Sequence, residues 1–213
     1  MNKVTLVTAA AVVMIGGGAC SAPIAEVSTS PPPAAPKSST KFTTVPDACE
    51  LLERETLAKY APEAACRPGA EDDLQTVNDK QEPIIRRGPR WEPAHTARQG
   101  KFHATVEVNL TLGLDTYAED QESAQRSISG SAVGNERPVA GIGDEASLYY
   151  GVGDKQGHNG NLARGILVSR WGNVSLRVFY WHYQAAASDD GLSEQQVLKA
   201  LKAITRDVYD DLS

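Results

Sequence analysis

The clearest pattern along the chain is a strict alternation of apolar and polar residues between positions 101 and 112. A period of two is typical of a strand with one buried face and one polar face. The two faces would carry Phe102, Ala104, Val106, Val108, Leu110 and Leu112 on the apolar side, and His103, Thr105, Glu107, Asn109 and Thr111 on the polar side. We therefore expect a half-buried strand here, in an antiparallel sheet.

Other segments predict the rest of this sheet. A short strand is expected between Pro83 and Trp91, and another ends near Tyr150. Residues 162–170 and 174–183 are rich in β-branched and aromatic residues, and turn residues between them favour a hairpin. The expected sheet therefore has about five strands.

Helix signals flank these strands. Asp47 and Glu50 favour a short helix at the start of the domain, followed by a second helix over residues 54–61. Asp115 is placed to cap a helix that runs to about residue 128.

The C-terminal helix has the strongest signal. Ser193 and Gln196 form a capping-box pattern, and the helix after them carries one apolar stripe, made of Val197, Leu201, Ile204, Val208 and Leu212. N-terminal and C-terminal helices packed against an antiparallel sheet predict an α+β fold, in a single domain over residues 45–213.

The first twenty residues have a pattern that predicts export. Lys3 precedes an apolar run from Val4 to Ile15, about twelve residues, which suits a signal peptide and is too short for a membrane-spanning helix. Small residues at 17–19 then lead to Cys20. This stretch resembles a bacterial lipoprotein signal, in which the chain is cut before the cysteine and the thiol receives a diacylglyceryl group. An ordinary secretory signal with an incidental cysteine is the alternative.

The lipoprotein resemblance implies a cellular location for the protein. Residues 1–20 would be the signal peptide, and Cys20 would carry a lipid anchor such as palmitate, which holds a membrane stably when two or more chains are attached. Residues 21–44 are rich in Ser, Thr, Ala and Pro, a composition typical of a disordered tether. The domain would then stand on the outer face of the cytoplasmic membrane.

The charge of the chain limits the classes of partner that we expect it to bind. The formal net charge is −6, and removal of residues 1–20 takes away Lys3 as the one charged residue, which leaves about −7. An acidic chain without a Lys/Arg cluster argues against nucleic-acid binding. No later segment is long and apolar enough to be expected to span a bilayer.

The cysteines carry a second consequence of export. If Cys20 is lipidated, Cys49 and Cys66 remain as a pair in an oxidising compartment, and a disulfide is the simplest interpretation. Two free thiols or a metal pair are the alternatives, although no His/Cys cluster accompanies them at zinc spacing.

No motif in the chain predicts catalysis. The segment Gly141–Glu145 lacks the further glycine, the lysine and the Ser/Thr of a phosphate loop, so glycines with positive φ at a tight turn explain it. His103 and Glu107 share a strand face, but two ligands do not make a metal site. A Gly-x-Ser-x-Gly elbow is absent from the sequence. We therefore expect no enzymatic activity, no cofactor and no bound metal.

One segment, residues 178–183, has the character of a binding surface. Alternation places Phe179, Trp181 and Tyr183 on one face of this strand. If that face is open, it offers aromatic surface to a sugar, lipid or peptide; if helices cover both faces, the run is core. With Trp171 and Arg177 as neighbours of the patch, these five residues are the candidate binding residues.

The order of these features resembles a known family. It comprises the lipoprotein signal, the tether, Asp47–Leu52 as Asp-Ala-Cys-Glu-Leu-Leu, the amphipathic strand, Gly141–Ala146 as Gly-Ile-Gly-Asp-Glu-Ala, a hairpin and a terminal helix. It is similar to actinobacterial surface lipoproteins that carry a domain of unknown function, and more distantly to extracytoplasmic sensor domains of actinobacterial receptor kinases. Family members often place a cysteine just before the early tryptophan; here Arg90 precedes Trp91, so Cys66 would have to replace it.

The sequence thus predicts a non-catalytic function. We expect a membrane-anchored lipoprotein that binds or senses a small ligand, an envelope component or another exported protein. An envelope-acting hydrolase and a structural adaptor for an exported partner are the alternatives.

Overall fold

The computed structural model describes residues 41–69, 75–93, 102–128, 136–154, 160–185 and 192–212. The chain divides into two units, and every described residue lies in the second, residues 35–213. The expected signal peptide, Cys20 and most of the expected tether therefore lie outside the described residues. Within these residues, no helix is long and apolar enough to cross a membrane.

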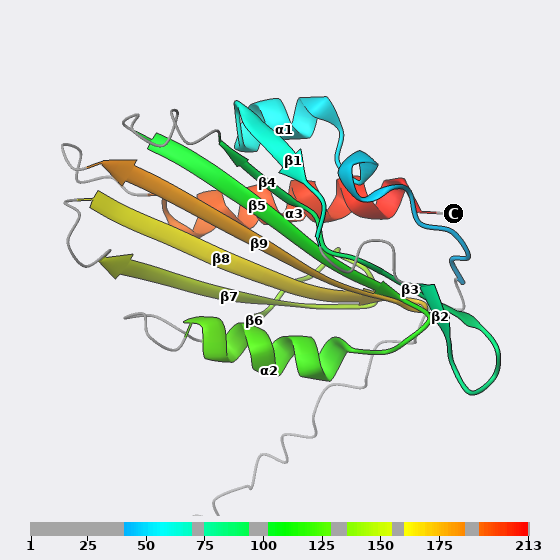
Figure 1. Ribbon diagram of the computed structural model, residues 1–213. Helices are drawn as coiled ribbons and strands as arrows, with labels where there is room; N and C mark the ends of the chain where they lie inside the picture. The colour runs from blue at the N-terminus through cyan, green and yellow to red at the C-terminus, as the bar shows by residue number, and fades with distance from the viewer. Residues whose placement is uncertain are drawn as a thin grey trace, which may run out of the picture. The chain divides into compact units, whose positions relative to one another are not determined.

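The second unit has α+β architecture, as the sequence predicts (Figure 1). Its elements in chain order are η1 (Ala48–Glu50), α1 (Arg54–Tyr60), β1 (Ala64–Arg67), β2 (Gln75–Val77), β3 (Pro83–Arg87), β4 (Arg90–Pro93), β5 (Phe102–Leu112), α2 (Tyr117–Ile128), β6 (Glu136–Pro138), β7 (Glu145–Asp154), β8 (Gly160–Trp171), β9 (Val174–Ala185) and α3 (Glu194–Asp210).

The strands form one antiparallel sheet in the order β1-β4-β5-β9-β8-β7-β6, with β3 paired to β5 and β2 paired to β3. Within the described residues the sheet has nine strands, so the expectation of about five is wrong. The sequence analysis missed strands β1, β2 and β6, and it expected one strand where β3 and β4 are separate. These five strands are short. Each has only three to five residues, too few to produce a readable alternation.

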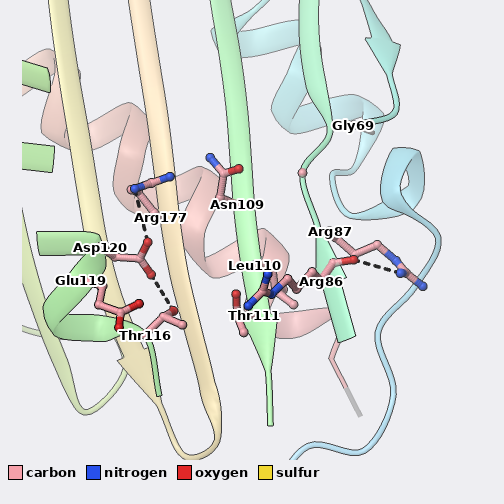
Figure 2. Close-up of a pocket in the computed structure, with 11 residues that line it drawn as sticks. Gly69, Arg86, Arg87, Asn109, Leu110, Thr111, Thr116, Glu119, Asp120 and Arg177 are labelled. Atoms are coloured by element: carbon pink, nitrogen blue, oxygen red, sulfur yellow. Dashed lines mark hydrogen bonds and ion pairs between the residues drawn. The ribbon is translucent and has the colours of Figure 1, made fainter. Parts of the chain in front are cut away.

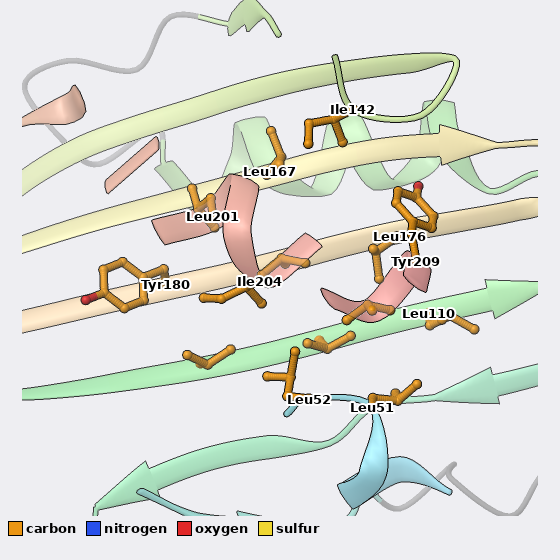
Figure 3. Packing of buried hydrophobic residues seen from close by; sticks show 14 of the residues in the cluster. Leu51, Leu52, Leu110, Ile142, Leu167, Leu176, Tyr180, Leu201, Ile204 and Tyr209 are labelled. Carbon is orange, nitrogen blue, oxygen red and sulfur yellow. The ribbon is translucent and has the colours of Figure 1, made fainter. Parts of the chain in front are cut away.

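The long central strands follow the predicted alternation. Val106, Val108 and Leu110 on β5 are buried and lie opposite even-numbered residues of β9 in the antiparallel register. Helix α3 covers this face of the sheet, and its predicted stripe from Val197 to Leu212 is buried against it. Figure 3 shows the layer between them, where side chains of β5, β8 and β9 meet α3 and the N-terminal segment.

Two local features fix α3 on the sheet. The predicted capping box is present: Ser193 accepts a hydrogen bond from the Gln196 amide, and the Gln196 side chain accepts one from the Ser193 amide. Gly165 on β8 lies directly beneath the helix. A Cβ at this position would overlap Val197 Cγ1 and lie 2.8 Å from Leu201 Cδ1, so glycine allows α3 to approach the strand closely.

The N-terminal segment is fastened to the same face. Cys49 and Cys66 form the predicted disulfide, and Cys66 lies opposite Trp91 in the β1–β4 register. The structure thus brings the second cysteine beside the early tryptophan, although the two are far apart in sequence. Phe42, which the sequence analysis assigned to the tether, is buried and packs edge-on against Trp171, with the two ring centres 5.2 Å apart.

Candidate functional site

The residues that the structure describes cover the other face of the sheet only in part. Helix α2 contacts β7, β8 and β9, and a second cluster of buried side chains lies beneath it, made of Tyr117, Ala124, Ile128, Tyr149, Ile166, Val168 and Phe179. A helix of twelve residues is about 18 Å long, whereas a strand of twelve residues extends about 40 Å. Helix α2 is therefore too short to shield the whole length of β9.

The position of α2 determines which end stays open. The N-cap position is Thr116, one residue after the predicted Asp115, because the Thr116 carbonyl accepts the first helical hydrogen bond, from the Asp120 amide. Asp115 accepts a hydrogen bond from the Tyr117 amide, and the Thr116 amide donates to Ser175 Oγ. The helix N-terminus therefore lies beside the β8–β9 turn. Trp181, further along β9, is only partly buried at the margin of the cluster. The sheet face beyond it, over β4, β5 and the end of β9, forms the candidate site.

A column of two stacked rings with a cation at each end crosses this boundary. The Arg90 guanidinium lies 5.5 Å from the Trp181 ring centre, and Trp181 stacks on Phe179 with ring centres 5.1 Å apart and planes 13° apart. The Arg177 guanidinium lies 5.0 Å from the Phe179 ring on the same strand. We call these four residues the Arg–aromatic column. Each cation–π contact is worth about 0.5–1 kcal/mol when exposed, so the column holds its members in register.

The Arg177 end of the column borders a pocket of about 300 Å³ between α2 and β3 (Figure 2). Asp120 lies 3.3 Å from an Arg177 nitrogen and accepts a hydrogen bond from Thr116 at 2.8 Å. Burial raises the pKa of Asp120, although the Thr116 hydrogen bond and the Arg177 charge act in the opposite direction. Arg177 Nε is buried and has no hydrogen-bond partner among the described residues. This pocket presents a mixed-charge surface to a polar ligand.

The Arg90 end borders a smaller pocket of about 200 Å³. It is lined by Arg90, His103, Thr105, Leu162, Trp181 and Tyr183. One wall is the indole of Trp181. The opposite side carries Tyr183, whose ring packs on His103 with centres 5.0 Å apart.

A buried carboxylate supports the cation at this pocket. Glu92 on β4 is only 8% exposed and lies on the same face as Arg90. Arg67 on β1 holds one Glu92 oxygen at 2.8 Å, while Arg90 Nε lies 3.8 Å from the other. Arg90 remains half exposed, at 49%, so its guanidinium faces both the indole and the solvent. The Glu92 carboxylate therefore orients Arg90 without burying it.

The structure separates the five sequence candidates into three groups. Trp181 and Tyr183 line the smaller pocket, and Arg177 lines the larger one. Phe179 is buried beneath α2 and supports Trp181 from behind. Trp171 lies on the opposite face of the sheet, between Phe42 and Tyr209, and takes no part in the site. Its inclusion among the candidates is wrong.

Sequence reasoning missed Arg90 and Asp120 as members of the site. Each stands in a segment that carries no binding signal of its own, and each reaches β9 only through the sheet register or the packing of α2. The hydrophobic pattern predicts pairs of neighbours within a strand, not which strands become adjacent.

The described residues include no group of three or more His, Cys, Asp or Glu side chains that could hold a metal ion. Gly141 and Gly143 have positive φ, as predicted for a structural turn, and Asp144 accepts a hydrogen bond from the Gly172 amide at 2.9 Å. The Gly141–Glu145 segment thus fastens two loops together. The side chains gathered on the open face are suited to stacking, ion pairing and hydrogen bonding.

No protein-family model, curated protein or solved structure matches the chain.

Proposed function

We propose that the protein is a lipid-anchored extracytoplasmic binding module, and that the open sheet face beyond α2 binds an acidic component of the cell envelope. The observation that carries this proposal is the incomplete cover of that face, which leaves Trp181, Tyr183 and Arg90 around a pocket. A planar aromatic surface with a half-exposed guanidinium is the kind of surface that recognises ligands by stacking and charge.

The charge distribution supports an acidic partner. The whole chain is acidic, with a formal charge of −6. Against that background, the registers place Arg67, Arg90 and Arg164 on the open face, from β1, β4 and β8, where Glu92 and Glu107 are the acidic neighbours. Local arginines attract an anionic ligand at short range even when the net charge of the protein is negative. Among the three kinds of partner that the sequence allows, an acidic envelope component fits this face best.

The membrane anchor is proposed from the resemblance of residues 1–20 to a lipoprotein signal, and it is tested by Cys20→Ser. We expect this variant to leave the membrane fraction for the soluble exported fraction, because it lacks the thiol that would carry the lipid. Retention of the variant in the membrane fraction would contradict lipid anchoring at Cys20.

Binding is tested with envelope polymer from which protein has been stripped. The full chain carrying Cys20→Ser, with no lipid of its own, should co-sediment with this polymer. Arg90→Gln in that background should reduce co-sedimentation. Arg206→Gln is the matched control, since it removes the same charge from an exposed position on α3, on the other face of the sheet. Equal sedimentation of both variants would contradict binding through the open face.

A further inference from the structure

The spacing of the aromatic residues on β9 leaves a gap of a defined width. Residues two apart on one strand face lie roughly 6.6 Å apart, and stacked atoms lie roughly 3.5–4.0 Å apart, so one ring fits between two such side chains when they stand slightly apart. Phe179 and Trp181 close their own gap by stacking on each other. Tyr183 packs across the strands onto His103 instead, and a pocket is lined by Tyr183, Trp181 and Arg90, whose guanidinium stands over the indole.

The volume of this pocket suits one ring. It measures about 200 Å³. A cavity of roughly 150 Å³ holds one benzene molecule, so the pocket has room for a six-membered ring with a small substituent.

The polar groups around the pocket define the substituent. The Arg90 guanidinium stands over the Trp181 ring, and Glu92 restrains it through a contact of 3.8 Å that is longer than a hydrogen bond. Guanidinium groups bind carboxylate and phosphate through paired, charge-assisted hydrogen bonds. Thr105 adds a hydroxyl beside the indole, which can donate or accept a hydrogen bond at the rim of the ring. An apolar wall with polar groups at its rim matches a sugar, whose ring face is apolar and whose edge carries hydroxyls.

We propose that the slot lined by Trp181 and Tyr183 binds a single acidic sugar residue, with the sugar ring packed against these two side chains and the acid group held by Arg90. This inference rests on the proposed function and names the ligand class of the same face. The sugar would belong to an acidic envelope polysaccharide, so the affinity for one residue is weak and the polymer gains strength from repeated binding.

The test follows the indole N–H signals in the NMR spectrum of the full chain carrying Cys20→Ser, titrated with glucuronate. The three tryptophans are assigned with Trp→Phe variants. We expect glucuronate to shift the Trp181 signal and to leave the signals of Trp91 and Trp171 in place, since Trp91 is buried and Trp171 lies on the other face. Glucose, which has the ring without the acid, should bind at least about tenfold more weakly, because it forms no charge-assisted hydrogen bond.

Variants separate the parts of the inference. Arg90→Gln should raise the dissociation constant for glucuronate at least about tenfold, while Arg206→Gln should leave it unchanged. Absence of any Trp181 shift with glucuronate overturns the slot. A Trp181 shift that Arg90→Gln does not weaken overturns the role of Arg90, and tighter binding of benzoate than of glucuronate overturns the assignment to a sugar. If polymer binding depends on Arg90 but Trp181 ignores glucuronate, the open face stands as a binding surface and the slot does not.

Discussion

Gly165 is the point where the close approach of α3 to the sheet can be tested most directly. Its backbone φ lies outside the left-handed region, so alanine fits the backbone of β8 and acts through its side chain alone. The added Cβ would overlap Val197 Cγ1 and crowd Leu201 Cδ1. Overpacking of a core by one carbon costs about 1–3 kcal/mol, and the loss of glycine's freedom in the unfolded chain offsets about 0.5–1 kcal/mol. We expect Gly165→Ala to destabilise the protein by about 0.5–2 kcal/mol.

The reason for that cost is tested by removing the atom that is in the way. Val197→Ala deletes two buried methyl groups and by itself costs about 2–3 kcal/mol, counting roughly 0.8 kcal/mol for each group and a further amount for the cavity. In the double variant the new Cβ occupies the space that the valine vacates. The two changes together should therefore cost about 1–2 kcal/mol less than the sum of their separate effects.

The assay is urea unfolding of the full chain, with the free energy of unfolding taken from the transition midpoint and slope. Val208→Ala is the matched control, because Val208 is the same residue, equally buried, on the same helix about 16 Å further along its axis. Gly165→Ala and Val208→Ala should add within about 0.5 kcal/mol. If the Val197 pair is also additive, or if Gly165→Ala alone is neutral, α3 is not held by close packing on this glycine.

Two further predictions concern the disulfide and the partly buried His182. Replacing Cys49 and Cys66 together by alanine opens a link with a sequence separation of 17 residues, which on the chain-entropy model lowers the free energy of unfolding by about 3 kcal/mol; an unchanged urea midpoint would contradict this. Burial lowers the pKa of His182, and the charge of His103 lowers it further. The unfolded chain therefore takes up this proton at higher pH than the folded protein does, so stability should fall as the pH drops below about 6.5 and recover as it rises. His182→Gln should lessen that pH dependence of the free energy of unfolding; an identical pH profile would show that His182 is not its source.

The sequence predicted the long elements well because each carries its own signal. Two patterns are repeated over several pleats or turns: the alternation of residues 101–112 and the stripe that starts at Val197. The capping box at Ser193 marks the start of the second, and tertiary packing reinforces all three signals. The short strands carry no such signal. Strand β1 has four residues, and the disulfide at Cys66 and the pairing with β4 determine its place in the sheet. These are long-range contacts, which a local pattern does not contain.

The role of each aromatic residue was harder to predict than its face. Alternation correctly put Phe179, Trp181 and Tyr183 on one side of β9, but it does not tell which of them a helix covers. Trp171 ends β8 in the same hairpin and falls on the other side of the sheet, against Tyr209 from the C-terminal helix. An aromatic residue beside a turn therefore remains ambiguous until the elements above and below the sheet are placed.

The lengths of the elements indicate in part which aromatic residues of β9 the helix α2 covers. The helix expected over residues 115–128 would be about 20 Å long and the strand expected over residues 174–183 about 33 Å, so this helix alone cannot cover the whole strand. Which end stays open follows from two contacts at the start of α2, the Thr116 amide on Ser175 and the ion pair of Asp120 with Arg177. Both place the helix over the turn end of the β8–β9 hairpin. Trp181 stays only partly buried because α2 covers Phe179 and not the strand beyond it. The candidate site is therefore a consequence of where a short helix is fastened to a long strand.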